Sequence, residues 1–165
     1  MAKPLTIRNR KALSEGVAAL CVIDPRFVAL HEAIGDPPLR LSRPGLATTL
    51  RVVTEQSISL KAAAAIWERL AATFDPTDPR AVLAVPPERL RELGLTLAKG
   101  KAFHGLARAA ADGMFERLSK LDDDAARAEL VALPGIGPWT AEVYMLSCLA
   151  RADAWPAGDV ALQTA

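Results

Sequence analysis

The sequence predicts an all-α fold, and three observations support this prediction. Ala, Leu, Glu and Arg, which favour helices, dominate the composition, whereas Tyr occurs once and Phe four times. Helix start and stop signals recur at short intervals, and no period-two strand pattern or internal repeat interrupts them. With 165 residues and 51% hydrophobic content, the chain is expected to form about eight to ten helices in an orthogonal array around one sizeable core.

Proline, glycine and capping residues mark the predicted elements of the first half. Asp24-Pro25 begins a helix that Gly35 ends, because glycine is a common residue just after a helix. Ser59 has the small polar side chain that caps a helix N-terminus. In chain order the signals predict a helix over 24–35, an extended connection over 36–45, and helices over 46–55 and 59–74.

The second half is marked in the same way. Asp78 follows a turn and precedes a proline, which is typical of an N-cap, and Thr96 and Asp122 are the N-cap residues predicted further on. Gly94 and Gly113 end two of these helices. The predicted helices begin at 78, run over 86–94, 96–113 and 122–133, and then begin again at 138 and at 159.

A tight hairpin is predicted where the helix over 122–133 ends. Pro134 stops that helix, Gly135 and Gly137 permit positive φ or close backbone approach, and Pro138 suits the first position of the next helix. The turn leaves bare amides beside a helix N-terminus, which is a ready site for an anion. Such amides would hold a DNA phosphate without reading base sequence. The alternative is an ordinary Gly-Pro turn between two packed helices.

The hairpin also carries a family resemblance. Leu133-Pro134-Gly135-Ile136-Gly137-Pro138-Trp139-Thr140-Ala141, then a helix, then the loop Trp155-Pro156-Ala157-Gly158-Asp159, resembles the helix-hairpin-helix–Gly/Pro–Asp (HhH-GPD) superfamily of DNA glycosylases. It is most similar to the 3-methyladenine DNA glycosylase II branch. Two upstream blocks, 53–63 and 94–99, resemble that branch in the same order, so that the resemblance covers nearly the whole chain.

The resemblance implies one glycosylase domain over 1–165 with two helical lobes. The central bundle would span 46–150 and include the hairpin over 133–141, and the second lobe would be built from 1–45 and 151–165. The sequence stops six residues after Asp159, where the family has several further helices. Either the sequence is truncated or the protein is unusually short. We therefore expect an incomplete second lobe, with apolar faces of the first helices partly uncovered.

Asp159 is the predicted catalytic residue. An Asp that follows Gly at the start of a helix is ordinarily an N-cap, and the two roles do not exclude each other. The position after the hairpin helix is what indicates catalysis, by resemblance to the family. Breaking an N-glycosidic bond builds positive charge on the sugar, which a fixed carboxylate stabilises while orienting water. The target base must first be flipped out of the duplex.

The identity of residue 139, a tryptophan in the hairpin, indicates whether the protein would also cut the DNA strand. Family members that also cut the strand have a lysine there, which attacks the sugar as an amine nucleophile. The nearest lysines in this sequence, Lys120 and Lys101, fall outside the motif. The resemblance therefore implies a monofunctional glycosylase that uses water and leaves an abasic site.

Three residues of the helix after the hairpin are candidates for the base pocket. Trp139 offers a π face that stacks well on a cationic base, and Val143 and Tyr144 could flank it. The alternative is core packing, because Trp139, Val143, Leu146 and Ala150 lie on one helical stripe. For Tyr144, an ordinary buried tyrosine is at least as good an interpretation.

The turn Gln56-Ser57-Ile58 is the candidate for filling the gap left by the flipped base. Gln56 can hydrogen-bond the orphaned partner base and Ile58 can wedge between base steps. The family often has a second Gln where this chain has Ser57, so the residue that fills the gap stays open. The alternative is a plain loop between helices with Ser59 as cap.

The hairpin residues expected at the DNA backbone are Leu133, Gly135, Ile136, Gly137 and Thr140. The resemblance also implies a monovalent cation held by the main-chain carbonyls of Leu133 and Ile136. No cofactor and no metal held by side chains is expected, since the sequence has no CxxC motif and no Cys/His cluster.

The composition limits the other function classes. A net charge of +1 is small for a polyanion binder, so DNA contact must come from a local patch and should be salt-sensitive. Cys21 and Cys148 lie in apolar helical segments and are expected as buried free thiols. His31 and His104 receive no role, and Trp67 is placed in the core. The sequence shows neither a signal peptide nor a membrane-spanning run, which predicts a cytoplasmic protein. We also expect a monomer, and the family resemblance implies double-stranded DNA as its partner.

Three functions are compatible with these observations. The first is removal of alkylated bases, chiefly 3-methyladenine and also 7-methylguanine, in base excision repair. The second is the same chemistry on mismatched or deaminated bases, since the sequence does not reveal the pocket. The third is a non-enzymatic DNA-binding module, which is favoured if the chain truly ends at Ala165.

Overall fold

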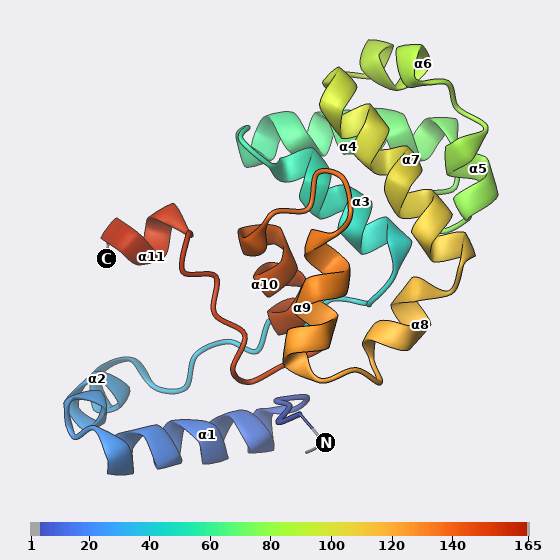
Figure 1. Ribbon diagram of the computed structural model, residues 1–165. Helices are drawn as coiled ribbons and strands as arrows, with labels where there is room; N and C mark the ends of the chain where they lie inside the picture. The colour runs from blue at the N-terminus through green and yellow to red at the C-terminus, as the bar shows by residue number, and fades with distance from the viewer. Residues whose placement is uncertain (1–3, 165) are drawn as a thin grey trace.

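The computed structural model describes residues 4–164, and this range forms eleven helices (Figure 1). Their bounds are α1 Arg10–Ile23, α2 Arg26–Ile34, α3 Leu46–Glu55, α4 Leu60–Thr73, α5 Pro79–Leu83, α6 Pro87–Glu92, α7 Leu97–Ala111, α8 Met114–Leu118, α9 Asp123–Val131, α10 Pro138–Ser147 and α11 Val160–Thr164. The one β-type pairing within 4–164 is an isolated antiparallel bridge between Thr6 and Arg151. The all-α prediction is confirmed.

The core of the molecule is built around α7, which packs against α3, α5, α6 and α8. The buried face of α7 includes Ala102, Phe103 and Leu106, whose spacing of three and four residues places them on one side of a helix. Helices α9 and α10 pack on each other, and α10 also contacts α3. Fully buried residues from the surrounding helices include Leu50, Leu70, Leu90, Leu118, Leu130 and Met145.

The helix caps agree with the sequence-based expectations. The side chains of Ser59, Asp78, Thr96 and Asp122 each accept a hydrogen bond from an amide in the first turn of the following helix. Gly113 has a φ of 72°, which an L side chain rarely adopts, and it separates α7 from α8. Local chemistry therefore predicts where these helices begin and end.

Two helices were not individually predicted. Asn9 caps α1 by accepting from the amide of Ala12, and α1 has no buried residues. The short α8 is held by burial of Met114, Phe115 and Leu118 against the core. A helix of five residues depends on such packing, because isolated short helices are marginal.

Helices α1 and α2 lie to one side of the bundle, and α11 projects from the bundle toward that side (Figure 1). Neither α1 nor α2 has a buried residue, and Val22, Ile23 and Ile34 are more than two-thirds exposed. The division into two lobes stays a prediction. In the described part of the chain, no helix is both long and apolar enough to cross a membrane.

Four residues outside the site are placed as follows. Cys148 is buried and its thiol pKa is raised by that burial, whereas Cys21 is only partly buried, contrary to expectation; both are free thiols. Cys21 stays partly exposed because α1 does not pack into the core. His31 pairs with the carboxylate of Asp36 at 2.8 Å. Trp67 packs against the core, as predicted.

Candidate active site

The hairpin between α9 and α10 rests on α7. Gly135 has a φ of 80°, and a Cβ on it would lie 2.6 Å from the Cβ of Ala102. Pro134 packs on Gly105 of the same helix. The Ile136 amide donates to the Leu133 carbonyl at 3.1 Å. This geometry requires glycine at position 135 for two independent reasons, backbone conformation and space.

The second hairpin glycine serves a different purpose. Gly137 is the N-cap of α10, has an ordinary φ of −85°, and a Cβ on it would meet nothing within 4 Å. No side chain caps α10, and Pro138 occupies its first turn. The start of α10 is therefore open to solvent on the side of Gly137, with helix amides free of a side-chain acceptor.

The end of α3 is tied to this hairpin. The Gln56 side-chain amide donates to the Gly135 carbonyl at 3.2 Å and to the Thr140 hydroxyl at 2.8 Å. Lys99 Nζ donates to the carbonyls of Thr54 and Gln56 at 2.9 and 2.7 Å, so it satisfies acceptors at the C-terminus of α3. Partial burial lowers the pKa of this ammonium group.

The predicted DNA-facing turn thus has three differently placed residues. The side-chain nitrogen of Gln56, Nε2, donates to the hairpin. The side-chain oxygen, Oε1, is therefore the atom of Gln56 that can meet a base. Ser57 has a φ of 58°, an uncommon conformation for a residue other than glycine. Ile58 is 38% exposed. The interpretation of this turn as the gap-filling element stays a prediction.

Asp159 uses its two carboxylate oxygens differently. Oδ1 accepts from the backbone amides of Ala161 and Leu162 at 2.9 and 3.3 Å, as an N-cap of α11 does. Oδ2 accepts from Trp139 Nε1 at 2.9 Å. The Trp139 hydrogen bond is the main cause that lowers the pKa of Asp159, and the amide of Leu162 adds to it. The carboxylate is therefore ionised at neutral pH.

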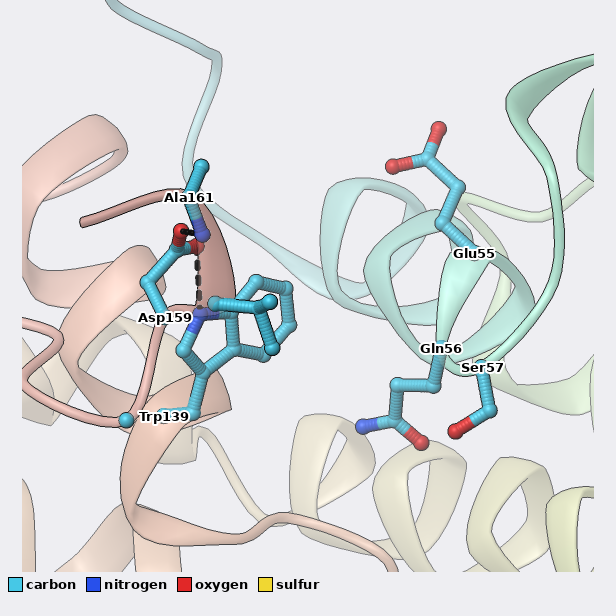
Figure 2. A pocket seen from close by; sticks show the side chains of 8 residues that line it. Glu55, Gln56, Ser57, Trp139, Asp159 and Ala161 are labelled. Atoms are coloured by element: carbon cyan, nitrogen blue, oxygen red, sulfur yellow. Dashed lines mark hydrogen bonds between the residues drawn. The ribbon is translucent and has the colours of Figure 1, made fainter. Parts of the chain in front are cut away.

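A cavity of about 420 Å³ lies beside this pair. Figure 2 shows Trp139 and Asp159 on one side of it, and Glu55, Gln56 and Ser57 from the end of α3 on the other. Residues from three distant parts of the sequence thus line one cavity. Its charged lining groups are the carboxylates of Asp159 and Glu55, and Arg51 pairs with Glu55 at 3.2 Å.

Two residues predicted for the base pocket lie elsewhere. Tyr144 is almost fully buried, its hydroxyl accepts from the Gly45 amide at 3.0 Å, and its ring lies 5.8 Å from that of Phe115. Val143 is partly buried and does not line the cavity. Tyr144 lies five residues after Trp139 on α10, which at about 100° per residue places it about 140° around the helix from the cavity-lining side, so Tyr144 faces the core. The interpretation of Tyr144 as an ordinary buried tyrosine is the one the structure favours.

Trp139 itself is not in the core. It is partly exposed and lines the cavity, and Leu146, on the same helical stripe, is 45% exposed. The stripe through Trp139, Val143 and Leu146 therefore faces outward, although Ala150 at its end is buried. Core packing of Trp139 was the wrong alternative.

The sequence interpretation missed Glu55 and Lys99. Glu55 directly precedes the predicted turn, and its carboxylate reaches the cavity because α3 ends there. Lys99 lies 43 residues from the carbonyl of Gln56 that it contacts. Its position at the third residue of a helix offered no signal for such a contact, since long-range partners leave no periodicity.

Comparison with known proteins identifies the family. Residues 50–165 match the family described as HhH-GPD superfamily base excision DNA repair protein. The chain is 34% identical over 160 residues to a Mycobacterium tuberculosis protein named "Probable bifunctional transcriptional activator/DNA repair enzyme AlkA", with 83% of this chain and 32% of that protein covered. It is 31% identical over 185 residues to the Escherichia coli "DNA-3-methyladenine glycosylase 2", with 93% of this chain and 62% of that protein covered. The chain thus spans less than two-thirds of these relatives.

A solved structure shows the same arrangement of helices. The crystal structure of a DNA-3-methyladenine glycosidase from Bacillus halodurans matches with a TM-score of 0.82 at 26% identity. The match covers 98% of this chain and 74% of that one. The similarity therefore extends over both ends of the described chain as well as the hairpin and the Asp159 loop.

Proposed function

The chain belongs to the HhH-GPD superfamily of base excision DNA repair proteins, and from this premise we propose that it is a DNA glycosylase for alkylated bases. Its substrates are 3-methyladenine and, in second place, 7-methylguanine in double-stranded DNA. Relatives named DNA-3-methyladenine glycosylase support this choice. The observation that carries the proposal is the ionised Asp159 carboxylate, held by Trp139 at the wall of a cavity that the end of α3 also lines.

The proposed reaction is hydrolysis of the N-glycosidic bond. A flipped base enters the cavity, whose volume lies within the usual range of about 300–1,000 Å³ for small-molecule sites. As the bond between C1′ and the base nitrogen breaks, a base with a formal positive charge takes the bonding electrons without prior protonation. Asp159 stabilises the charge that develops on the sugar and orients the water that attacks C1′. An abasic site remains.

Water is the proposed nucleophile because Trp139 occupies the hairpin position at which strand-cutting relatives have lysine. Trp139 instead offers an aromatic wall to a cationic base. The test is incubation with alkylated duplex in the presence of borohydride, which traps an amine–sugar adduct, and separate treatment with hot alkali. We expect strand breaks only after alkali and no trapped protein, and a trapped adduct would show that an amine does the chemistry.

The hairpin is the proposed contact to the DNA backbone, and the turn over 56–58 the proposed filler of the gap. The open start of α10 at Gly137 supports the first assignment, because a phosphate could approach its amides closely. The carbonyls of Leu133 and Ile136 would hold a monovalent cation there, and the Ile136 carbonyl accepts no hydrogen bond from the described residues. The cation would add positive charge beside the phosphate. The protein would act as a monomer on chromosomal DNA, in the cytoplasm.

Asp159→Asn tests the mechanism directly. The variant keeps the size of the side chain but removes its charge, so base release from alkylated duplex should fall roughly 100-fold or more. Affinity for an abasic duplex should change little, because the hairpin is intact. Asp153→Asn, an exposed residue on the same loop, is the matched control and should retain activity. Near-normal turnover of the Asp159 variant would refute the proposed mechanism.

A further inference from the structure

Besides Asp159, a second carboxylate lies near the site, that of Glu142 on α10, and it holds the loop that leads to Asp159. Glu142 lies three residues after Trp139 and is only 8% exposed. Its Oε2 accepts from the backbone amide of Trp155 at 2.9 Å, and its Oε1 accepts from Arg127 Nε on α9. Arg127 is held in turn by Asp124 at 2.8 Å. The carboxylate therefore joins both hairpin helices to the loop.

The contact at Trp155 determines where the following residues lie. The Ala157 amide donates to the Trp155 carbonyl, and the Asp159 amide donates to the Pro156 carbonyl, both at 2.8 Å. Two consecutive tight turns thus connect the residue that Glu142 holds to the residue that Trp139 holds. Two side chains of α10, those of Glu142 and Trp139, therefore hold the two ends of this segment by hydrogen bonds.

Besides these bonds, the segment has one further hydrogen bond, from Gln163 Nε2 to the Ala157 carbonyl at 3.1 Å, and few packing contacts. Pro156 is buried, but the Trp155 side chain is 65% exposed, and Ala157 and Gly158 are exposed. Gly158 has nothing within 4 Å of the position of a Cβ. A segment with so few packing contacts depends on its hydrogen bonds for a defined position.

We propose that Glu142 is a positioning residue that sets the place of the Asp159 carboxylate. The inference rests on the proposed glycosylase function and extends it. A carboxylate satisfies both donors, because each of its two oxygens accepts one hydrogen bond. An amide at this position has one acceptor oxygen and one donor group, so it can satisfy Arg127 or the Trp155 amide but not both. Loss of the second contact frees the start of the segment.

The experiment is a double-mutant cycle on base release. Glu142→Gln should lower single-turnover base release from alkylated duplex about tenfold to 100-fold, the scale of a small misplacement of a catalytic group. Affinity for an abasic duplex should stay within about twofold, since the hairpin amides do not move. In an Asp159→Asn background the same change should cause no further loss, because Glu142 acts through Asp159. Glu129→Gln on α9, which removes an equal charge away from the loop, is the control.

Two results would overturn the proposal. One is wild-type activity in Glu142→Gln, and the other is a loss that multiplies with that of Asp159→Asn. If Glu142→Gln fails to fold, Glu142→Asp provides the same cycle, because it keeps the charge beside Arg127 but cannot span both donors.

A spectroscopic readout separates this proposal from the proposed function. The indole N–H resonance of Trp139 reports its hydrogen bond to Asp159 and can be assigned among the three tryptophans by single Phe replacements. In Glu142→Gln it should move toward its position in Asp159→Ala, where the bond cannot form, while the Trp67 resonance stays. An unmoved Trp139 resonance would refute the positioning role even if the chain released no base. A moved resonance in a protein without glycosylase activity would refute the function alone.

Discussion

Gly135→Ala should destabilise the protein strongly, although it adds one methyl group. The new Cβ would lie 2.6 Å from the Cβ of Ala102 on α7, far inside van der Waals contact, and the φ of 80° is unfavourable for any L side chain. Gly137→Ala, two residues further on in the same hairpin, provides the matched control. Its φ is −85° and its Cβ would meet nothing within 4 Å.

The magnitude follows from the two separate causes. The left-handed conformation costs about 1–2 kcal/mol and the overpacking about 1–3 kcal/mol, and the reduced entropy of the unfolded chain offsets about 0.4–1 kcal/mol. The net loss in the free energy of unfolding is therefore about 1–5 kcal/mol, or roughly 2–20 °C in melting temperature for a chain of this size. Gly137→Ala should stay within about 0.5 kcal/mol of the wild type.

Thermal and urea unfolding of the variants would measure these differences, and Ala102→Gly separates the causes. Without the Ala102 Cβ, the nearest atom to the new methyl group is the Ala102 Cα at 3.9 Å, an ordinary contact. In the double variant the overpacking should disappear, which gives a favourable coupling energy of about 1–3 kcal/mol, while the strain of φ remains. Equal stabilities of the two glycine variants, or no coupling to Ala102, would refute the packing argument.

Three further predictions concern the site. Gly137→Val should keep the melting temperature but weaken binding to all duplexes alike, whatever their sequence, because the added side chain crowds the approach of phosphate. Fluorescence anisotropy measures this binding, and unchanged affinity would show that the DNA binds elsewhere. Trp139→Phe removes the hydrogen bond that is the main cause of the lowered pKa of Asp159, so this pKa should rise and the acid limb of the pH profile of base release should move to higher pH. An unmoved acid limb would show that Asp159 is not the group that titrates in it. Lys99→Met removes the donor to the carbonyls of Thr54 and Gln56, so the free energy of unfolding measured in urea should fall by about 1–3 kcal/mol. An unchanged midpoint of urea unfolding would mean that water replaces the ammonium group.

The parts of the fold that the sequence predicted are those set by neighbouring residues. Ser59, Thr96 and Asp122 cap helices because each side chain accepts a hydrogen bond from the amide three residues further on. The hairpin turn was likewise predictable from its prolines and glycines. The different requirements at Gly135 and Gly137 were not, since the crowding atom belongs to Ala102, 33 residues earlier.

The parts that the sequence did not predict depend on distant partners. Tyr144 meets Gly45 across 99 residues and Lys99 meets Gln56 across 43. A helical period tells which residues share a face but not which neighbour that face meets. Glu142 received no role from the sequence, because only the fold brings the Trp155 amide and Arg127 to its two oxygens.

Asp159→Ser should separate the two roles that one carboxylate combines. Serine caps helices about as well as aspartate, so its hydroxyl can replace Oδ1 toward the amides of Ala161 and Leu162. It has no second oxygen to accept from Trp139 and no charge to place beside the sugar. We therefore expect stability within about 0.5 kcal/mol of the wild type but base release as low as in Asp159→Asn, whereas Asp159→Ala should also lose about 1 kcal/mol of stability with the cap. Unfolding curves and single-turnover assays on the three variants decide the matter, and retained base release in the serine variant would mean that capping, not charge, is what the reaction needs from this position.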